Sequence, residues 1–195
     1  MSTIPLAVAV LLVTSTATPT PPAEACRAAA GAYFEAITLG DADAALALVE
    51  HPSEADRITV RASAASARGL RRLEELAQSR FGQRGDVGIS VRHRRLLDAI
   101  KRATVELRDD RAVLRPERER PVRLRRIDGA WKIESPAKRL TGEERRALRD
   151  ALRKTENATR DLAERIHSGA VKSAQEVRDA LRKALGRNEE EGVPL

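Results

Sequence analysis

Aromatic residues make up only 2% of this chain of 195 residues. They are Tyr33, Phe34, Phe81 and Trp131. A surface that stacks nucleobases needs several aromatic side chains together, and small-molecule pockets are commonly lined by them. Their scarcity argues against both kinds of site. It also predicts a core built mainly from Ala, Leu, Val and Ile.

Cysteine and histidine are equally scarce. Cys26 is the single cysteine of the chain, which excludes an intramolecular disulfide and a zinc site built from several cysteines. His51, His93 and His167 stand far apart and lack the spacing of metal ligands. We therefore expect no metal site, and no residue pattern implies a cofactor.

Positive charge is in excess, with 36 Lys and Arg residues against 29 Asp and Glu residues and a formal net charge of +7. Arg is interleaved with acidic residues through most of the chain, as on solvated helix faces. The excess also favours contact with an anionic polymer. The candidate anion-binding residues are the doublets Arg71-Arg72, Arg94-Arg95 and Arg125-Arg126.

The N-terminus has the pattern of an export signal. The apolar run Ile4–Val13 has the length of a signal-peptide core and is too short to span a bilayer. A Pro-rich linker follows, so residues 1–22 are expected to be leader and linker of a periplasmic or secreted protein. Cleavage after Ala17 or Ala25 fits the small residues there. The second cut would leave Cys26 first, where a lipid anchor could be attached; alternatively, Cys26 is a small apolar residue of the first helix.

Three helices are predicted from the spacing of apolar residues in the first half of the chain. The first covers 23–39 and the second 41–50, separated by a C-terminal Gly40 and an N-capping Asp41. The third is expected to begin near Ser63 or Ser66 and to end at Gly82. The segment 87–100 fits either a strand or a helix.

Beyond residue 102 the apolar period changes to two, which indicates strands. Strands are expected at 103–107, 112–114, 122–127 and 131–133. Asp109-Asp110 and Asp128-Gly129 are placed as hairpin turns between them. This pattern predicts an antiparallel meander with one face covered by the helices, and hence an α+β domain over residues 23–136.

Residues 137–187 predict a helical hairpin, because capping boxes begin at Thr141 and Ser173 and a Gly lies between the helices. A heptad-like seam runs along the first of these helices: Leu148, Leu152, Thr155, Thr159, Leu162 and Ile166. The seam could pack on the domain or form an arm for a protein partner or for self-association. The acidic tail 188–195 is expected to be disordered.

The order of these elements resembles the NTF2-like superfamily from about Ala25 to Ser135. The residues that carry the resemblance are Tyr33-x7-Asp41 and the closing pattern Val122-x-Leu124-x2-Ile127-Asp128-Gly129-x-Trp131-Lys132-Ile133. The resemblance implies a cystatin-like curved antiparallel sheet packed on N-terminal helices, with a conical pocket. Some members of the superfamily are enzymes, such as ketosteroid isomerase, and many others only bind, dimerise or scaffold.

The resemblance also implies where a pocket would lie. Tyr33 falls where isomerase-like members place a Tyr that donates to a developing oxyanion. A carboxylate base would come shortly after the second helix, where Glu54 and Asp56 are the candidates. On the sheet, the position expected to face Tyr33 is Arg123, which is permanently charged and cannot replace the second acid of such a site. Trp131 is the remaining pocket candidate.

These observations lead to three hypotheses of function. The first is an exported, non-enzymatic NTF2-like module that acts through protein contacts or self-association. The second is a small-molecule-binding or weakly catalytic protein with a pocket around Tyr33. The third is a binder of an anionic polymer through the Arg doublets. Because the N-terminus predicts export, intracellular nucleic acid is the partner least expected.

Overall fold

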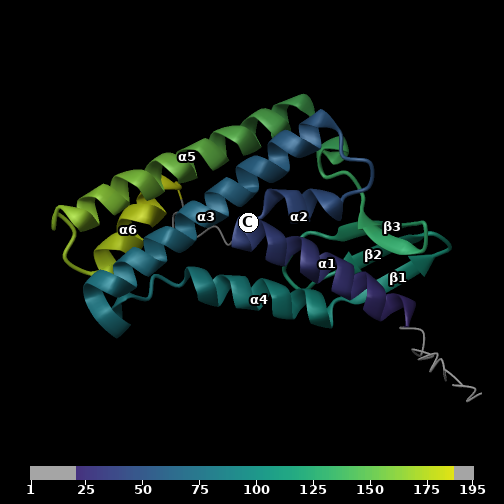
Figure 1. The fold of residues 1–195 in the computed structure, drawn as a ribbon, viewed down its shortest axis with the longest axis horizontal. Helices are drawn as coiled ribbons and strands as arrows, with labels where there is room; N and C mark the ends of the chain where they lie inside the picture. The colour runs from purple at the N-terminus through teal and green to yellow at the C-terminus, as the bar shows by residue number, and fades with distance from the viewer. Residues whose placement is uncertain (1–20, 187–195) are drawn as a thin grey trace, which may run out of the picture.

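The computed structural model describes residues 21–186 and shows an α+β protein (Figure 1). Its helices are α1 (Pro22–Leu39), α2 (Ala42–Ala47), α3 (Glu54–Phe81), α4 (Ile89–Arg102), α5 (Gly142–His167) and α6 (Ala174–Ala184), with short 3₁₀ helices η1 (Gly82–Gly85) and η2 (Ala137–Arg139). The predicted signal peptide and acidic tail lie outside the described residues.

The four strands form one antiparallel sheet in the order of the chain, as predicted. They are β1 (Thr104–Arg108), β2 (Arg111–Arg115), β3 (Val122–Ile127) and β4 (Ala130–Ile133). Asp128 and Gly129 both have positive φ, 49° and 81°, which is the backbone of the tight turn expected between β3 and β4. Alternate residues of β2, β3 and β4 are buried, so one face of the sheet packs inward and the other faces solvent, whereas β1 has no buried residue.

The structure corrects the predicted start of the third helix. α3 begins at Glu54, about ten residues earlier than expected, and runs for 28 residues. Ser53 and Asp56 form a capping box at its start, in which each side chain bonds the backbone N–H of the other. The stretch 61–69 of this helix is rich in Ala and Ser and lacks large apolar residues, so its helical period is hard to detect from sequence.

The open segment 87–100 is helical, since α4 occupies Ile89–Arg102. The second predicted helix is shorter than expected and ends at Ala47. Its chain then passes beside β4, where Val49 forms an isolated parallel bridge with Ile133. Glu50 N donates to Ile133 O at 2.8 Å, and Ile133 N donates to Leu48 O at 2.7 Å.

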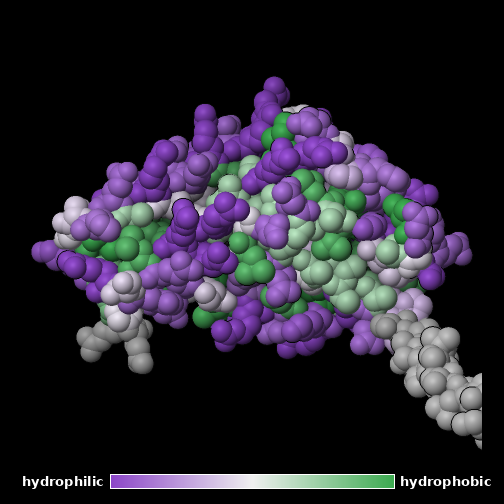
Figure 2. Space-filling view, viewed as in Figure 1, coloured by the Kyte–Doolittle hydropathy of each residue, from purple (hydrophilic) through white to green (hydrophobic). Residues whose placement is uncertain are grey.

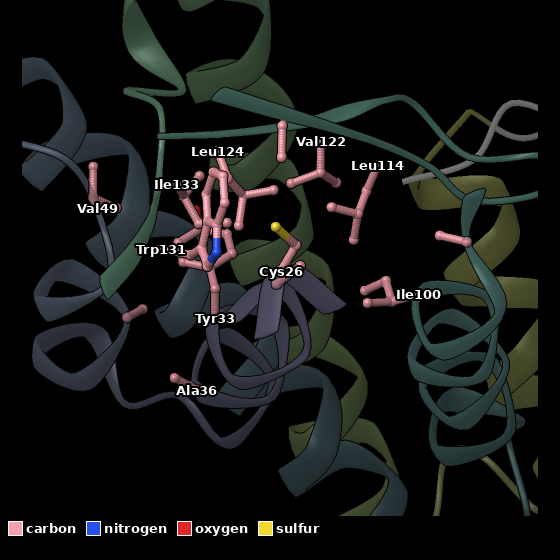
Figure 3. Packing of buried hydrophobic residues seen from close by; sticks show 14 of the residues in the cluster. Cys26, Tyr33, Ala36, Val49, Ile100, Leu114, Val122, Leu124, Trp131 and Ile133 are labelled. Carbon is pink, nitrogen blue, oxygen red and sulfur yellow. The ribbon is translucent and has the colours of Figure 1, made fainter. Parts of the chain in front are cut away.

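The first hydrophobic core lies between the inward face of the sheet and the helices α1 and α2. It contains Cys26 and Tyr33 from α1 and Leu114, Leu124 and Trp131 from the strands. Figure 3 shows these side chains pointing toward one another from the two layers. Ile100 of α4 closes one end of this core.

A second hydrophobic core joins α3 to the C-terminal hairpin. It contains Leu73 and Ala77 of α3, Leu162 and Ile166 of α5, and Val177 of α6. α3 and α5 lie side by side along much of their length (Figure 1). The hairpin therefore packs on the domain, the first of the two alternatives left by its sequence.

The contact between α3 and α5 is close because Gly69 lies opposite Thr159. A Cβ atom at Gly69 would be 3.0 Å from Thr159 Oγ1. Thr155, Ala158 and Thr159, which are small residues, are buried along this part of α5. The two Thr residues of the predicted seam thus serve a close helix–helix contact.

Side chains are not evenly distributed on the surface. In Figure 2, hydrophobic residues gather over α1 and α2, whereas hydrophilic residues cover most of α3 and α5. Ala28, Ala32 and Leu39 are exposed on α1, and Leu39 is 52% exposed. Among the described residues, no helix combines the length and the hydropathy needed to cross a bilayer.

Candidate functional site

Tyr33 lies on the buried face of α1 and is 8% exposed. Its ring meets the ring of Phe34 edge to face, with 5.1 Å between the centroids. Trp131 of β4, also 8% exposed, points toward Tyr33 from the sheet (Figure 3). Both aromatic pocket candidates are therefore part of the first core.

Asp56 is fully buried and joins three parts of the chain. Its carboxylate accepts hydrogen bonds from Ser53 N at 3.0 Å and Ser53 Oγ at 2.6 Å, both at the start of α3. Ser135 Oγ, just after β4, donates to the same carboxylate at 2.7 Å. The backbone N–H of Ala137, which is the first residue of η2, donates to Asp56 Oδ1 at 2.9 Å. We call Ser53, Asp56, Ser135 and Ala137 the Asp56 joint.

These contacts decide the charge of Asp56. Burial alone would raise the pKa of its carboxyl group, but the hydrogen bonds from Ser53, Ala137 and Ser135 outweigh burial and hold the pKa below its usual value. The pKa of the Tyr33 phenol is raised to about 12, mainly because the phenol is buried and in addition because the Asp56 carboxylate is negatively charged. Asp56 is thus ionised and Tyr33 is neutral at physiological pH.

Glu54 and Arg123, the two remaining pocket candidates, are exposed and do not join Tyr33 and Trp131 in the first core. Glu54 is exposed in the first turn of α3. Arg123 is exposed on the solvent face of β3, because its neighbours Val122 and Leu124 take the buried positions. The expectation that Arg123 faces Tyr33 is therefore not met. The five pocket candidates are therefore separated: Tyr33 and Trp131 are in the first core, Glu54 and Asp56 are at the start of α3, and Arg123 is on the outer face of the sheet.

Cys26 is a core residue of α1, with its thiol 0% exposed. Burial raises the pKa of this thiol to about 11, against a smaller lowering effect of Arg27. The residue lies one turn inside α1, so cleavage before it would remove the first turn of that helix. This placement favours the interpretation of Cys26 as a small apolar core residue.

The three Arg doublets lie on three different elements of the fold. Arg71 and Arg72 are on α3, where Arg71 lies 3.5 Å from Glu75. Arg94 and Arg95 are exposed on α4. Arg125 and Arg126 are at the sheet, where Arg125 pairs with Glu50 and Asp110.

Sequence reasoning missed a second buried carboxylate, Glu74 of α3, which is 2% exposed. Its side chain accepts from Ile89 N at 3.0 Å, from Ser90 N at 3.1 Å and from Ser90 Oγ, and so caps the start of α4. The pKa of the nearby His93 is lowered, mainly by burial. The charge of Glu74 acts against this shift, and the charge of Arg71 adds to it. The role of Glu74 is to orient α4, and no local motif signals it.

A surface groove of 510 Å³ lies between α3 and α5, and none of its lining residues is a predicted site residue. Its lining is mostly apolar and consists of Leu76, Ala163, Glu164, His167 and Ser168. These residues border the second core rather than the first. The groove therefore does not correspond to the conical pocket expected around Tyr33.

Within residues 21–186, no three His, Cys, Asp or Glu side chains are placed to hold a metal ion. The Asp56 carboxylate already accepts hydrogen bonds from four donors of its own chain: Ser53 N, Ser53 Oγ, Ser135 Oγ and Ala137 N. Comparison with protein-family models, curated proteins and solved structures finds no match to this chain.

Proposed function

We propose that this chain is an exported, non-enzymatic protein with an NTF2-like domain that acts through contacts with other proteins. The observation that carries the proposal is the Asp56 joint. Asp56, the candidate base whose charge acts on Tyr33, is held ionised by donors of its own chain, and its pKa is lowered. A general base needs a pKa close to the working pH and an acceptor that faces the substrate.

The NTF2-like assignment is supported by the element order and by the packing of α1 and α2 on one face of an antiparallel meander. The hairpin of α5 and α6 extends this unit through a second core. Export is supported by the apolar run Ile4–Val13 in the sequence. A fusion of the full chain to a reporter that is active only outside the cytoplasm tests export: activity should require residues 2–20.

The surface best suited to a protein contact is the apolar face of α1, which exposes Ala28, Ala32 and Leu39. Crosslinking of the mature protein in its host should trap a protein complex. Ala32→Arg should remove that complex, because a long cation would replace a small apolar contact. Ala147→Arg is the matched control, since Ala147 is also an exposed alanine, on α5.

Native mass spectrometry of the purified mature protein provides the opposing test. The proposal predicts a protein mass with no small molecule retained. A stoichiometric small molecule that is retained by the wild type and lost from Tyr33→Phe would contradict the proposal and support the pocket hypothesis.

A further inference from the structure

The solvent face of the sheet carries a line of cations that crosses all four strands. Arg108 of β1 lies opposite Arg111 of β2, which lies opposite Arg125 of β3, which lies opposite Lys132 of β4. We call these four residues the cation row. The strand neighbours of Arg111, Arg125 and Lys132 are buried, namely Ala112, Leu124, Trp131 and Ile133, so these three cations face outward. Arg108 shares their face because it lies directly opposite Arg111.

The cation row is unfavourable for the sheet on its own. Like charges directly opposite one another on neighbouring strands repel. Strands are about 4.8 Å apart, so four cations lie within roughly 15 Å. A chain that only needed a solvated sheet face could alternate charges here, as it does where Arg115 pairs with Glu106 at 2.6 Å.

Part of the cation row is compensated within the chain, and part is not. Arg125 pairs with Glu50 at 3.1 Å and with Asp110 at 3.0 Å, and Lys132 Nζ donates to Ala47 O at 2.6 Å. Arg108 and Arg111, in contrast, are exposed, and no ion pair of 4 Å or less joins either of them to another residue that the structure describes, although the charge of Arg108 acts on Glu106 and that of Arg111 acts on Asp110. Half of the row is thus available to an external anion.

We infer that the cation row binds a base-free phosphate polymer laid across the sheet. A line of cations complements a chain with repeated negative charge better than it complements a single small anion. No aromatic residue lies on this face, since Tyr33, Phe34 and Trp131 belong to the first core. A nucleic acid would therefore find charges but no stacking platform.

This surface differs from the doublets expected from sequence. Of those six arginines, only Arg125 belongs to the cation row, and the other members become neighbours only through strand register. The inference is also independent of the exposed apolar face of α1, because α1 packs on the opposite side of the sheet from the cation row.

Titration of the full chain with inorganic polyphosphate at a series of salt concentrations tests the inference. Binding should weaken steeply with salt, with a log–log slope of about −0.7 for each phosphate contact. The double variant Arg108→Gln/Arg111→Gln should bind polyphosphate on the order of tenfold more weakly at low salt. The magnitude of its log–log salt slope should be smaller than that of the wild type by about 1.4, because two phosphate contacts are lost. The control Arg145→Gln/Arg149→Gln removes the same charge from exposed positions of α5 and should bind as the wild type does.

A urea titration of each variant separates binding from folding. Because Arg108→Gln/Arg111→Gln relieves repulsion, its urea midpoint should equal or exceed that of the wild type. An equal loss of polyphosphate binding in both double variants would overturn the inference in favour of overall charge. Tighter binding to an oligo(dT) of equal charge, or binding only to phosphatidylglycerol vesicles, would overturn it in favour of nucleic acid or of a membrane surface.

Discussion

Asp56 is a buried charge that is stabilised by its own chain. Its hydrogen bonds reach Ser135 and Ala137, about 80 residues further along the sequence. It therefore fixes the start of α3 to the end of β4 and orients the segment that leads into α5. Hydrogen bonds to a buried charged group contribute more to stability than neutral ones, and leaving their donors unpaired is costly.

Removal of the Asp56 side chain should destabilise the protein strongly. Asp56→Ala leaves Ser135 and the Ala137 N–H without an acceptor, and we expect a loss of about 2–4 kcal/mol in the free energy of unfolding. Asp41→Ala is the control, since Asp41 caps α2 at an exposed position and its loss should be about 1 kcal/mol. Urea denaturation measures both; equal losses would show that the Asp56 joint has no special role.

The same residue predicts an acid-dependent stability. Because the pKa of Asp56 is lowered in the fold, the unfolded chain takes up a proton first as the pH falls below about 4. The stabilisation by Asp56 is therefore present above that pH and is lost as the pH falls through the folded pKa. The difference in unfolding free energy between wild type and Asp56→Asn should be largest near pH 7 and should shrink toward acid. A difference that is constant with pH would contradict this account.

Cys26 should be chemically silent in the native protein. Its thiol is buried in the first core and its pKa is raised to about 11, so very little thiolate exists at pH 8. A thiol reagent should label Cys26 only after addition of denaturant. Native labelling at the rate of a free cysteine would show that α1 does not bury this residue.

At the scale of elements, strands were easier to predict than helix ends. Alternation of apolar residues and the Asp128-Gly129 turn indicated all four strands correctly. The start of α3 was missed because Ala and Ser residues hide its period, although Ser53-x-x-Asp56 is a capping box visible in the sequence. α4 stayed ambiguous because its apolar face is short and only Ile100 of it is fully buried.

The close contact of α3 with α5 gives a prediction for Gly69. Gly69→Ala should gain about 1 kcal/mol of helix propensity, but its Cβ would crowd Thr159 Oγ1 at 3.0 Å, so the net effect in the wild type should be near zero. In a Thr159→Ala background the gain should emerge. A double-mutant cycle by urea denaturation measures this coupling. The same effect of Gly69→Ala in both backgrounds would rule out the contact.

At the scale of the whole molecule, α3 links two cores that lie on different parts of its length. The first core could be expected from sequence, since the strands and the first helix each show an apolar face. The second could not, because nothing local indicates that the seam of α5 meets Leu73 and Ala77 rather than another chain. The Asp56 joint and the cation row were likewise hidden, since both depend on contacts between distant residues.

The shared second core predicts that the hairpin cannot be removed without damage. Truncation after Arg139 would strip Leu162, Ile166 and Val177 from α3 and should lower the melting temperature sharply or prevent folding. Truncation after Gly186 is the control, because it retains every residue of both cores. Thermal melting followed by circular dichroism measures the difference, and equal melting of the two forms would show that the hairpin is an independent arm.

The central claim is that the Asp56 carboxylate, whose charge acts on Tyr33, is a structural anchor rather than a proton acceptor for a substrate. The most direct measurement is an NMR titration of the Asp56 side-chain carboxyl carbon in the full chain. We predict a pKa below the ordinary value of about 3.9, set by the hydrogen bonds from Ser53, Ser135 and Ala137. A pKa raised above the ordinary range, toward neutral pH, would contradict the account and restore Tyr33 and Asp56 as a candidate active site.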